Sequence, residues 1–278
     1  MTTYRKLVAA AAVATSILAL SSCGSDDKSN DVAAGCTPAH TFSTIKKGTL
    51  TVAAFGNPPF AKVEGGSASG VDPEMLAEIA KTECLKVDYQ LVDSAAVIPA
   101  VQSGRVDIAI GNWYRTKKRS EVVGMTDPTY LDQMALVASS PVSDIQSLKG
   151  KNVGTVDGYL WVADLKALLG DKLKVYPSPV NMFQDLKAGR IEVGVDGFGS
   201  ASFSAKGMST SVASPDPAVA ASQNAAQSTF PVTKDNTALQ EALNAGIAKL
   251  KSDGRLAEIL KKNGLDGSAA DTGEPRLS

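Results

Sequence analysis

The chain of 278 residues has few of the side chains that most often bind metal ions. It contains one histidine, His40, and three cysteines, and no cluster of histidine, cysteine and acidic residues has the spacing of a metal site. We therefore expect neither a metal nor a cofactor. Aromatic residues are also scarce, at 5%, so any local concentration of them is informative.

An excess of positive charge is absent as well. The whole chain has 28 lysine and arginine residues against 29 aspartate and glutamate residues. Removal of residues 1–22 as a leader takes away Arg5 and Lys6 and no acid, which leaves 26 cations against 29 anions, a net charge of −3. This balance does not favour a nucleic-acid partner.

The one long apolar run lies at the N-terminus. Residues 7–20, LVAAAAVATSILAL, follow Arg5 and Lys6. The run is shorter than the ~20 residues of a membrane-spanning helix, and it is typical of a secretory signal. It ends in Leu-Ser-Ser-Cys, which resembles the lipobox of bacterial lipoproteins and implies that Cys23 is lipidated. A conventional signal with an incidental cysteine is the alternative.

The segment after Cys23 is small and polar. It has too little apolar surface to fold, so we expect residues 23–45 to be a tether that holds the protein outside the cytoplasmic membrane through the lipid alone. In an exported protein the two remaining cysteines, Cys36 and Cys84, are expected to form a disulfide. Two buried free thiols are the alternative.

The remaining sequence alternates between strand and helix patterns. Residues 49–55 and 106–112 are apolar, β-branched runs, and residues 71–83 have the features of a helix. A second alternating block covers residues 151–200. Such alternation predicts parallel sheets covered by helices, with ligands bound beyond the carboxyl ends of the strands. Residues 267–278 lack periodicity, and we expect them to be disordered.

The motifs in this order resemble the family 3 extracellular solute-binding proteins, which are receptors for polar amino acids in ABC importers. The resemblance covers residues 49–265. The segments that carry it are GTLTVAAFGNPPF, GVDPEMLAEIA, VIPAVQSGRVDIAIGNWYRTKKRSEVVGMTDPTY, LKGKNVGTVDG, LKAGRIEVGVDG and LQEALNAGIAKLKSDGRLAEILKK.

This resemblance implies an α/β periplasmic-binding-protein type II fold, with two lobes joined by two hinge strands. We expect residues 46–135 and 228–266 to form lobe 1 and residues 136–227 to form lobe 2. The hinges are expected near residues 133–139 and 226–232.

The resemblance also implies a binding site for a ligand carboxylate. Family members read AGMTITPER where this chain reads GNWYRTKKR. Asn112 then stands in the place of a small residue, Tyr114 in the place of a hydroxyl donor, and Arg119 in the place of the arginine that grips the carboxylate. A guanidinium can bind a carboxylate through two parallel hydrogen bonds.

Other positions depart from the family pattern. Asn57 replaces an aromatic lid, with Phe60 nearby, and Gly158-Tyr159 replaces Gly-Thr. Gly197 stands where the family often has an aspartate for the ligand ammonium. Adjacent strand residues face opposite sides, so Asp196 serves only if a bulge or the end of the strand redirects it. The expected ligand-binding residues are Asn57, Phe60, Asn112, Trp113, Tyr114, Arg119, Gly158, Tyr159 and Asp196, with Trp161 expected mainly to pack.

The leading hypothesis is a monomeric binding protein without catalytic residues. It would deliver an amino acid or a related small carboxylate to ABC permease subunits, by closing its lobes on the ligand. One alternative is an enzyme of the cyclohexadienyl dehydratase type, for which Asp157 or Asp196 would be the acid or base. Another is the ligand-binding subunit of a sensor system.

Overall fold

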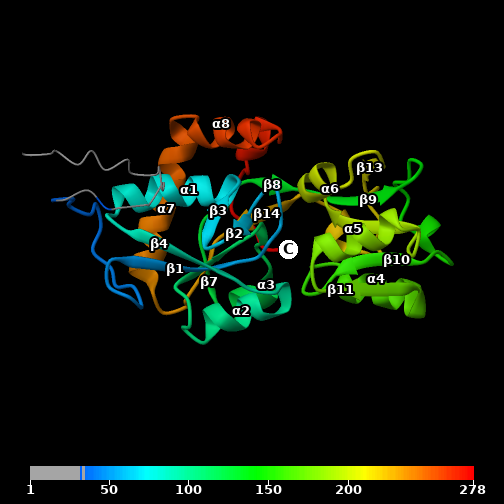
Figure 1. Cartoon of the computed structure of the whole chain (residues 1–278), viewed down its shortest axis with the longest axis horizontal. Coiled ribbons are helices and arrows are strands. Elements are labelled where there is room, and N and C mark those ends of the chain that lie inside the picture. Colours follow the sequence, from blue (N-terminus) through cyan, green and yellow to red (C-terminus); the bar gives the residue numbers. More distant parts are fainter. Residues whose placement is uncertain (1–31, 33–34) are drawn as a thin grey trace, which may run out of the picture.

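The structure is a computed structural model in which residue 32 and residues 35–278 are described. The predicted leader and the predicted lipid attachment at Cys23 lie outside the described residues. Figure 1 shows two α/β bodies side by side along the long axis of the molecule. In the part of the chain that is described, no helix combines the length and the apolar character needed to cross a bilayer.

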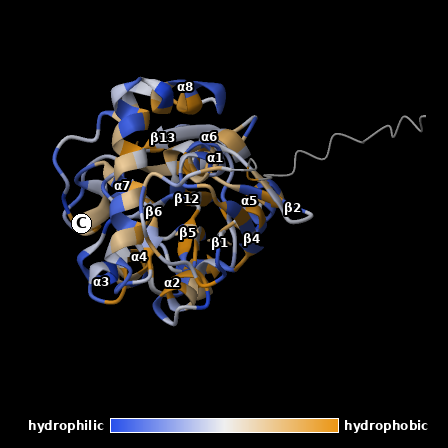
Figure 2. Ribbon diagram, turned by 90° about the vertical axis from the view of Figure 1, so that its left-hand side faces the viewer, coloured by the Kyte–Doolittle hydropathy of each residue, from blue (hydrophilic) through white to orange (hydrophobic). Residues whose placement is uncertain are grey.

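Lobe 1 is built on a five-stranded sheet of order β4-β1-β5-β15-β7. Strand β1 pairs in parallel with β4 and β5, whereas β15 pairs antiparallel with β5. All six residues of β1 are buried, as a parallel strand covered on both faces requires, and Figure 2 shows β1 and β5 as hydrophobic strands inside the lobe. The elements are β1 (Thr49–Ala54), β4 (Lys86–Leu91), β5 (Ile108–Ile110), β7 (Gly124–Met125), β15 (Pro231–Val232), α1 (Val71–Thr82), α2 (Ser94–Gln102), α7 (Thr237–Ser252) and α8 (Arg255–Lys262), with the small hairpin β2 (Lys62–Glu64) and β3 (Ser67–Ser69).

Lobe 2 is built on a second five-stranded sheet of order β11-β10-β12-β9-β13. Its centre is parallel, because β10 pairs in parallel with β11 and β12, and β9 is antiparallel to β12. The elements are β9 (Met134–Ala138), β10 (Val153–Val156), β11 (Leu173–Tyr176), β12 (Val193–Gly197), β13 (Ser209–Val212), α4 (Val162–Leu169), α5 (Pro179–Lys187) and α6 (Phe198–Ser204), with the 3-10 turns η1 (Gln146–Leu148), η2 (Gly170–Lys172) and η3 (Ala220–Ser222).

Two strands that cross between the lobes lie next to each other. Strand β8 (Leu131–Asp132) leads into β9, and β14 (Ala226–Thr229) leads back into β15. These two strands pair antiparallel, and β14 also pairs with β6 (Trp113–Tyr114) of lobe 1. The arrangement agrees with the predicted architecture of two lobes joined by two strands. It places the loop after β6, with the short helix α3 (Lys117–Ser120), beside the crossing.

The predicted disulfide is present. Cys36 and Cys84 are bonded, with their Cα atoms 5.8 Å apart. The bond attaches the N-terminal segment to the residues that follow α1, where His40 Nδ1 also lies 2.7 Å from Glu83 Oε1. The flexible segment that the sequence predicts up to residue 45 is therefore anchored to lobe 1 from Cys36 onward.

The prediction of a disordered C-terminal segment is wrong. Residues 267–270 form the 3-10 helix η4 (Gly267–Ala270), and the following residues run along strand β14. The buried side chain of Gln227 in β14 donates to the carbonyls of Thr272 and Glu274 at 2.9 and 2.8 Å, and it accepts from the Arg276 amide at 2.8 Å. These contacts involve the backbone of the segment, so they need no side-chain periodicity that a sequence pattern could reveal.

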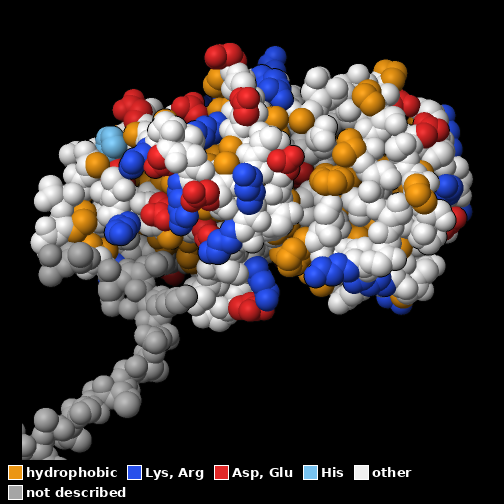
Figure 3. All heavy atoms as spheres, turned by 90° about the horizontal axis from the view of Figure 1, so that it is seen from above, with side chains coloured by type: hydrophobic (Ala, Val, Ile, Leu, Met, Phe, Trp, Pro, Cys, Tyr) orange, Lys and Arg blue, Asp and Glu red, His pale blue; other side chains and the backbone are white. Residues whose placement is uncertain are grey.

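The surface carries charges of both signs. In the view of Figure 3, lysine and arginine side chains alternate with aspartate and glutamate over the same face, and single hydrophobic residues lie between them. Along one edge of lobe 2 in this view, a short row of lysine and arginine side chains lies together.

Candidate functional site

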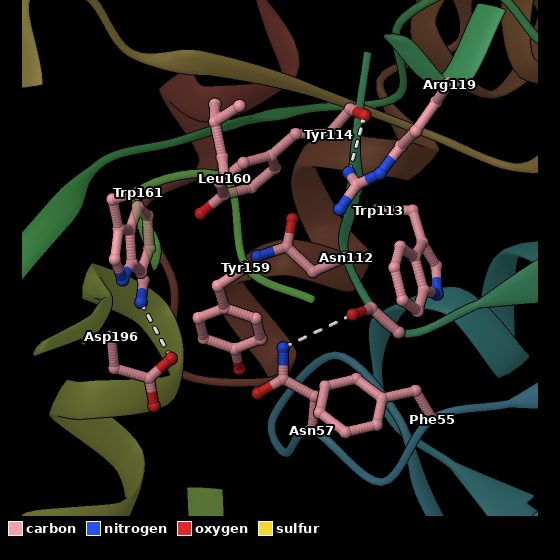
Figure 4. A pocket seen from close by; sticks show the side chains of 12 residues that line it. Phe55, Asn57, Asn112, Trp113, Tyr114, Arg119, Tyr159, Leu160, Trp161 and Asp196 are labelled. Atoms are coloured by element: carbon pink, nitrogen blue, oxygen red, sulfur yellow. Dashed lines mark hydrogen bonds between the residues drawn. The ribbon is translucent and has the colours of Figure 1, made fainter. Parts of the chain in front are cut away.

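A cleft between the lobes gathers most of the predicted site residues (Figure 4). The space left among their side chains is about 20 Å³, little more than one water molecule needs. Any larger molecule must therefore enter while the lobes are apart. Lobe 1 contributes Phe55, Asn57, Gly111, Asn112, Trp113, Tyr114 and Arg119, and lobe 2 contributes Tyr159, Leu160, Trp161, Asp196 and Gly197.

Arg119 is a partly buried cation without an acidic partner. Thr116 caps its short helix, α3, and the Thr116 side chain accepts from the Arg119 amide at 3.1 Å. The guanidinium donates to the carbonyls of Tyr114 and Gly158 at 2.8 and 3.0 Å, and it lies 4.7 Å from the centre of the Trp113 ring. Desolvation lowers its pKa to about 10. No acid among the described residues forms an ion pair with it, so its charge is available to an anion.

Two asparagines present oxygen atoms to the cleft. The amide nitrogen of Asn57 donates to the Gly111 carbonyl at 3.2 Å, and that of Asn112 donates to Asp132 Oδ2 at 2.6 Å. Each amide orientation is thereby fixed, and each Oδ1 is buried without a hydrogen-bond partner. A carbonyl oxygen can only accept. These two side chains therefore attract a donor such as an ammonium group, and Asn112 does not favour the carboxylate that the resemblance assigns to its position.

Asp196 reaches the cleft because strand β12 ends beside it. Helix α6 begins two residues later, and the carboxylate accepts from the Gly197 amide at 2.8 Å and from Ser200 Oγ at 2.9 Å. The side chain is 1% exposed, and this burial raises its pKa to about 7. Asp196 and Tyr159 both line the cleft from lobe 2.

Asp132 is a functional candidate that the sequence analysis missed. It lies on the crossing strand β8, and its Oδ2 accepts from Asn112 Nδ2 at 2.6 Å and from the Tyr114 hydroxyl at 2.9 Å. Its Oδ1 accepts from the amides of Gln133 and Gly199 at 3.0 and 3.2 Å. Burial raises its pKa. The Tyr114 hydroxyl is thus engaged by a carboxylate of the chain itself, where the resemblance predicts that it donates to a ligand.

Gly197 leaves the space that the Asp132 carboxylate occupies. A Cβ atom at residue 197 would lie 2.3 Å from Asp132 Oδ2 and 3.0 Å from the Tyr114 hydroxyl. The first distance is well below van der Waals contact, so no side chain can be added at residue 197 without moving Asp132. The absence of a side chain at Gly197 and the presence of the Asp132 carboxylate are therefore linked.

Asp72 supports the cleft from the start of helix α1. Its Oδ2 accepts from the amides of Gly111 and Asn112 at 2.8 and 3.1 Å, and its Oδ1 accepts from the Tyr130 hydroxyl at 2.7 Å. Burial raises its pKa to about 6. Asn112 has a φ of +64°, a conformation that few residues other than glycine adopt, and the bonds to Asp72 hold it. The sequence shows that Asp72 lies at a helix start, but it does not show that Asp72 binds the distant amides of Gly111 and Asn112.

Phe60 does not line the cleft as the sequence analysis expects. It stacks on Tyr130 inside lobe 1, with ring centres 5.3 Å apart and planes at 4°. Phe55 lines the cleft instead, edge-on to Tyr159 across the lobes at 6.3 Å. The reason is local, because Phe55 directly follows β1, whereas the loop that follows turns Phe60 back beneath helix α1.

The other predicted aromatic residues surround the cleft. Trp113 and Tyr159 line it, and so does Trp161, which also packs in the core of lobe 2 and donates from Nε1 to Thr155 Oγ1 at 2.7 Å. The lobes also touch directly at the rim, where Ser94 Oγ donates to the Asp157 carbonyl at 2.6 Å. The Asp157 side chain itself is exposed.

Comparison with known proteins gives a consistent result. Residues 50–266 match the family model described as bacterial extracellular solute-binding proteins, family 3. The probable amino-acid-binding protein YxeM of Bacillus subtilis is 28% identical over 83% of this chain and 89% of its own length. The histidine-binding periplasmic protein of Salmonella typhimurium is 28% identical over 74% of this chain and 84% of its own.

Solved structures agree with these relatives. An ancestral arginine-binding protein bound to glutamine has a TM-score of 0.69 and 28% sequence identity, over 78% of this chain and 98% of the other.

Proposed function

Because the chain belongs to the bacterial extracellular solute-binding proteins of family 3, we propose that it is the receptor of an ABC importer for an α-amino acid. The relatives that are named for an amino acid support this class of ligand. The cleft supports this class of ligand independently, because its hydrogen-bond donors and its acceptors come from different side chains.

The observation that carries the proposal is the separation of donors and acceptors in the cleft. Arg119 offers guanidinium donors without an acidic partner, while Asn57 Oδ1 and Asn112 Oδ1 are buried acceptors without a partner. Asp196 adds a carboxylate from lobe 2. An α-amino acid has the complementary pair of groups, since its carboxylate suits Arg119 and its ammonium suits the oxygens.

The same arrangement accounts for ligand-driven closure. Arg119 and the asparagines belong to lobe 1, whereas Asp196 and Tyr159 belong to lobe 2. A ligand that bonds to both sides favours the closed form by its additional contacts there. The bending would occur at β8 and β14, which carry the chain between the lobes, and the closed form would then dock on the permease subunits.

Lipid anchoring is part of the proposal. Acylation of Cys23 would hold the protein at the outer face of the cytoplasmic membrane, and the residues up to Cys36 would form the tether. A Cys23→Ser variant should move from the membrane fraction to the soluble extracytoplasmic fraction. If it stays with the membrane, the anchor is not at Cys23.

The binding mode is tested by calorimetric titration of Arg119→Gln with the best ligand of an amino-acid panel. Each charge-assisted hydrogen bond contributes about 1.5–3 kcal/mol, so losing two should weaken binding by about 100-fold or more. Lys118→Gln, on the same short helix but exposed, is the matched control and should bind as the unaltered protein does. Binding by Arg119→Gln within a few-fold of the unaltered protein would show that the carboxylate lies elsewhere.

A further inference from the structure

Resting on the function proposed above, we propose that the side chain of the bound amino acid is itself positively charged. The reason is an imbalance of buried charge around the cleft. Asp196 lines the cleft, and two further carboxylates lie directly behind its lining, because Asp72 and Asp132 each accept a hydrogen bond from the lining residue Asn112. Each of the three residues is at most 6% exposed. The cleft itself contains one cationic side chain, that of Arg119.

No cation of the described chain neutralises these carboxylates. Asp72 and Asp132 accept only from backbone amides, hydroxyl groups and a side-chain amide, and Asp196 accepts from an amide and the hydroxyl of Ser200. None of the three is among the ion pairs of the described residues. Burial raises the pKa of all three carboxyl groups, because desolvation disfavours their charged form, and a cation placed beside them would favour that form again.

The net charge of the ligand then decides how well this imbalance is relieved. A neutral amino acid adds one positive and one negative group, so the excess of carboxylates over Arg119 is unchanged. An acidic amino acid increases the excess. A ligand with a cationic side chain reduces it by one charge, and buried charges are stabilised mainly by such pairing.

The surroundings also suit a second cationic group. The centre of the Phe55 ring lies 6.0 Å from that of Trp113 and 6.3 Å from that of Tyr159, and a cation is attracted to the face of such rings. Asn57 lies beside the Phe55 ring, with its oxygen on the side away from that ring (Figure 4), and Asn57 Oδ1 offers an unpartnered acceptor. An ammonium, guanidinium or imidazolium group could donate a hydrogen bond to this oxygen.

Asp196 and Asp132 have different roles in the proposed binding of a cationic ligand. Asp196 lines the cleft and keeps free acceptor positions for direct contact. Asp132 already accepts four hydrogen bonds, which fill the positions of a carboxylate. It therefore acts as a positioning residue, through its charge and by turning the Asn112 amide so that the oxygen is left for the ligand.

The test compares ligands that differ in charge and little in shape. Arginine and citrulline share the α-amino-acid group, but the guanidinium of arginine is replaced by a neutral urea in citrulline. Calorimetric titration should give at least 100-fold tighter binding for arginine, and lysine should bind more tightly than norleucine by a similar factor. Citrulline or glutamine binding within threefold of the best cationic amino acid would overturn the inference and leave the proposed function standing.

A different result would show failure of the proposed function itself. If no α-amino acid binds, or if agmatine, which lacks the α-carboxylate, binds as tightly as arginine, the carboxylate role of Arg119 is wrong. The two failures are therefore distinguishable in one panel.

Variants locate the source of the preference. Asp196→Asn and Asp132→Asn keep the size of each side chain and remove its charge, so each should lower the ratio of arginine to citrulline affinity by about tenfold or more. Asp171→Asn, an exposed aspartate of the same lobe, is the matched control and should leave the ratio unchanged. Melting curves verify that each variant is folded. An unchanged ratio in both Asp196→Asn and Asp132→Asn would overturn the assignment.

Discussion

Replacement of Gln227 by alanine should loosen the attachment of the C-terminal segment to the strand that joins the lobes. Gln227 is 1% exposed, and its side chain makes three hydrogen bonds of 2.8–2.9 Å to the backbone of residues 272–276. At a net contribution of about 1 kcal/mol for each bond, the variant should lose about 3 kcal/mol of unfolding free energy. For a chain of this size, that corresponds to a fall in melting temperature of roughly 6–12 °C.

The measurement is thermal and urea unfolding followed by tryptophan fluorescence. Both tryptophans, Trp113 and Trp161, are buried near the cleft, so each lobe contributes a reporter. Gln90→Ala is the matched control, because Gln90 is an exposed strand residue, and it should change the melting temperature little.

A double-mutant comparison tests the mechanism. In a chain that ends at residue 271, the partners of Gln227 are absent, so Gln227→Ala should then cost much less than it does in the whole chain. Equal destabilisation in the two backgrounds would refute the idea that Gln227 acts by holding the C-terminal segment. A loss below about 1 kcal/mol in the whole chain would refute the magnitude.

Two further predictions concern the cleft. Gly197→Ala places a Cβ 2.3 Å from Asp132 Oδ2, so it should cost about 1–3 kcal/mol of unfolding free energy through overpacking; an unchanged melting temperature would contradict the geometry. Because burial raises the pKa of Asp196 to about 7, the folded carboxyl takes up a proton before the unfolded one does. The Asp196 contribution to the stability of the ligand-free protein should therefore increase as pH falls from 8 toward 4, relative to Asp196→Asn. Affinity for a cationic ligand should decrease over the same range, and parallel trends in stability and affinity would count against this assignment.

Sequence reasoning located the cleft because strand order and strand direction determine it. Strands β1 and β5 are parallel neighbours, so the residues that follow them emerge at the same edge of the sheet. Asn57 and the segment 112–119 meet there for this reason. The register of the family motif then predicted Arg119 at this edge, where it does line the cleft, on a short helix capped by Thr116 and with its guanidinium bonded to the Tyr114 and Gly158 carbonyls.

The remaining features depend on contacts between segments that are far apart in the chain. Asp132 bonds to Asn112 and to Gly199, and no local pattern indicates either partner. The C-terminal segment is held by groups far away in the chain, among them the Gln227 side chain and the backbone of Arg115. The direction of the Phe60 side chain could not be predicted for a simpler reason. A loop of five residues after a strand can place an aromatic side chain in the core or in the cleft, and its composition does not distinguish the two.

The polarity of the cleft depends on the groups that hold its side-chain amides in place. Asp132 and the Gly111 carbonyl bind the amide nitrogens of Asn112 and Asn57, and each of these bonds leaves a buried amide oxygen without a partner in the protein. If Asp132 is replaced by a residue that cannot accept, the Asn112 amide is free to turn its nitrogen toward the cleft, and an acceptor then becomes a donor. A change of ligand class therefore does not require a change in any residue that touches the ligand. In this chain such a change should occur at Asp132 and Gly197 together, because a side chain at residue 197 would collide with the Asp132 carboxylate.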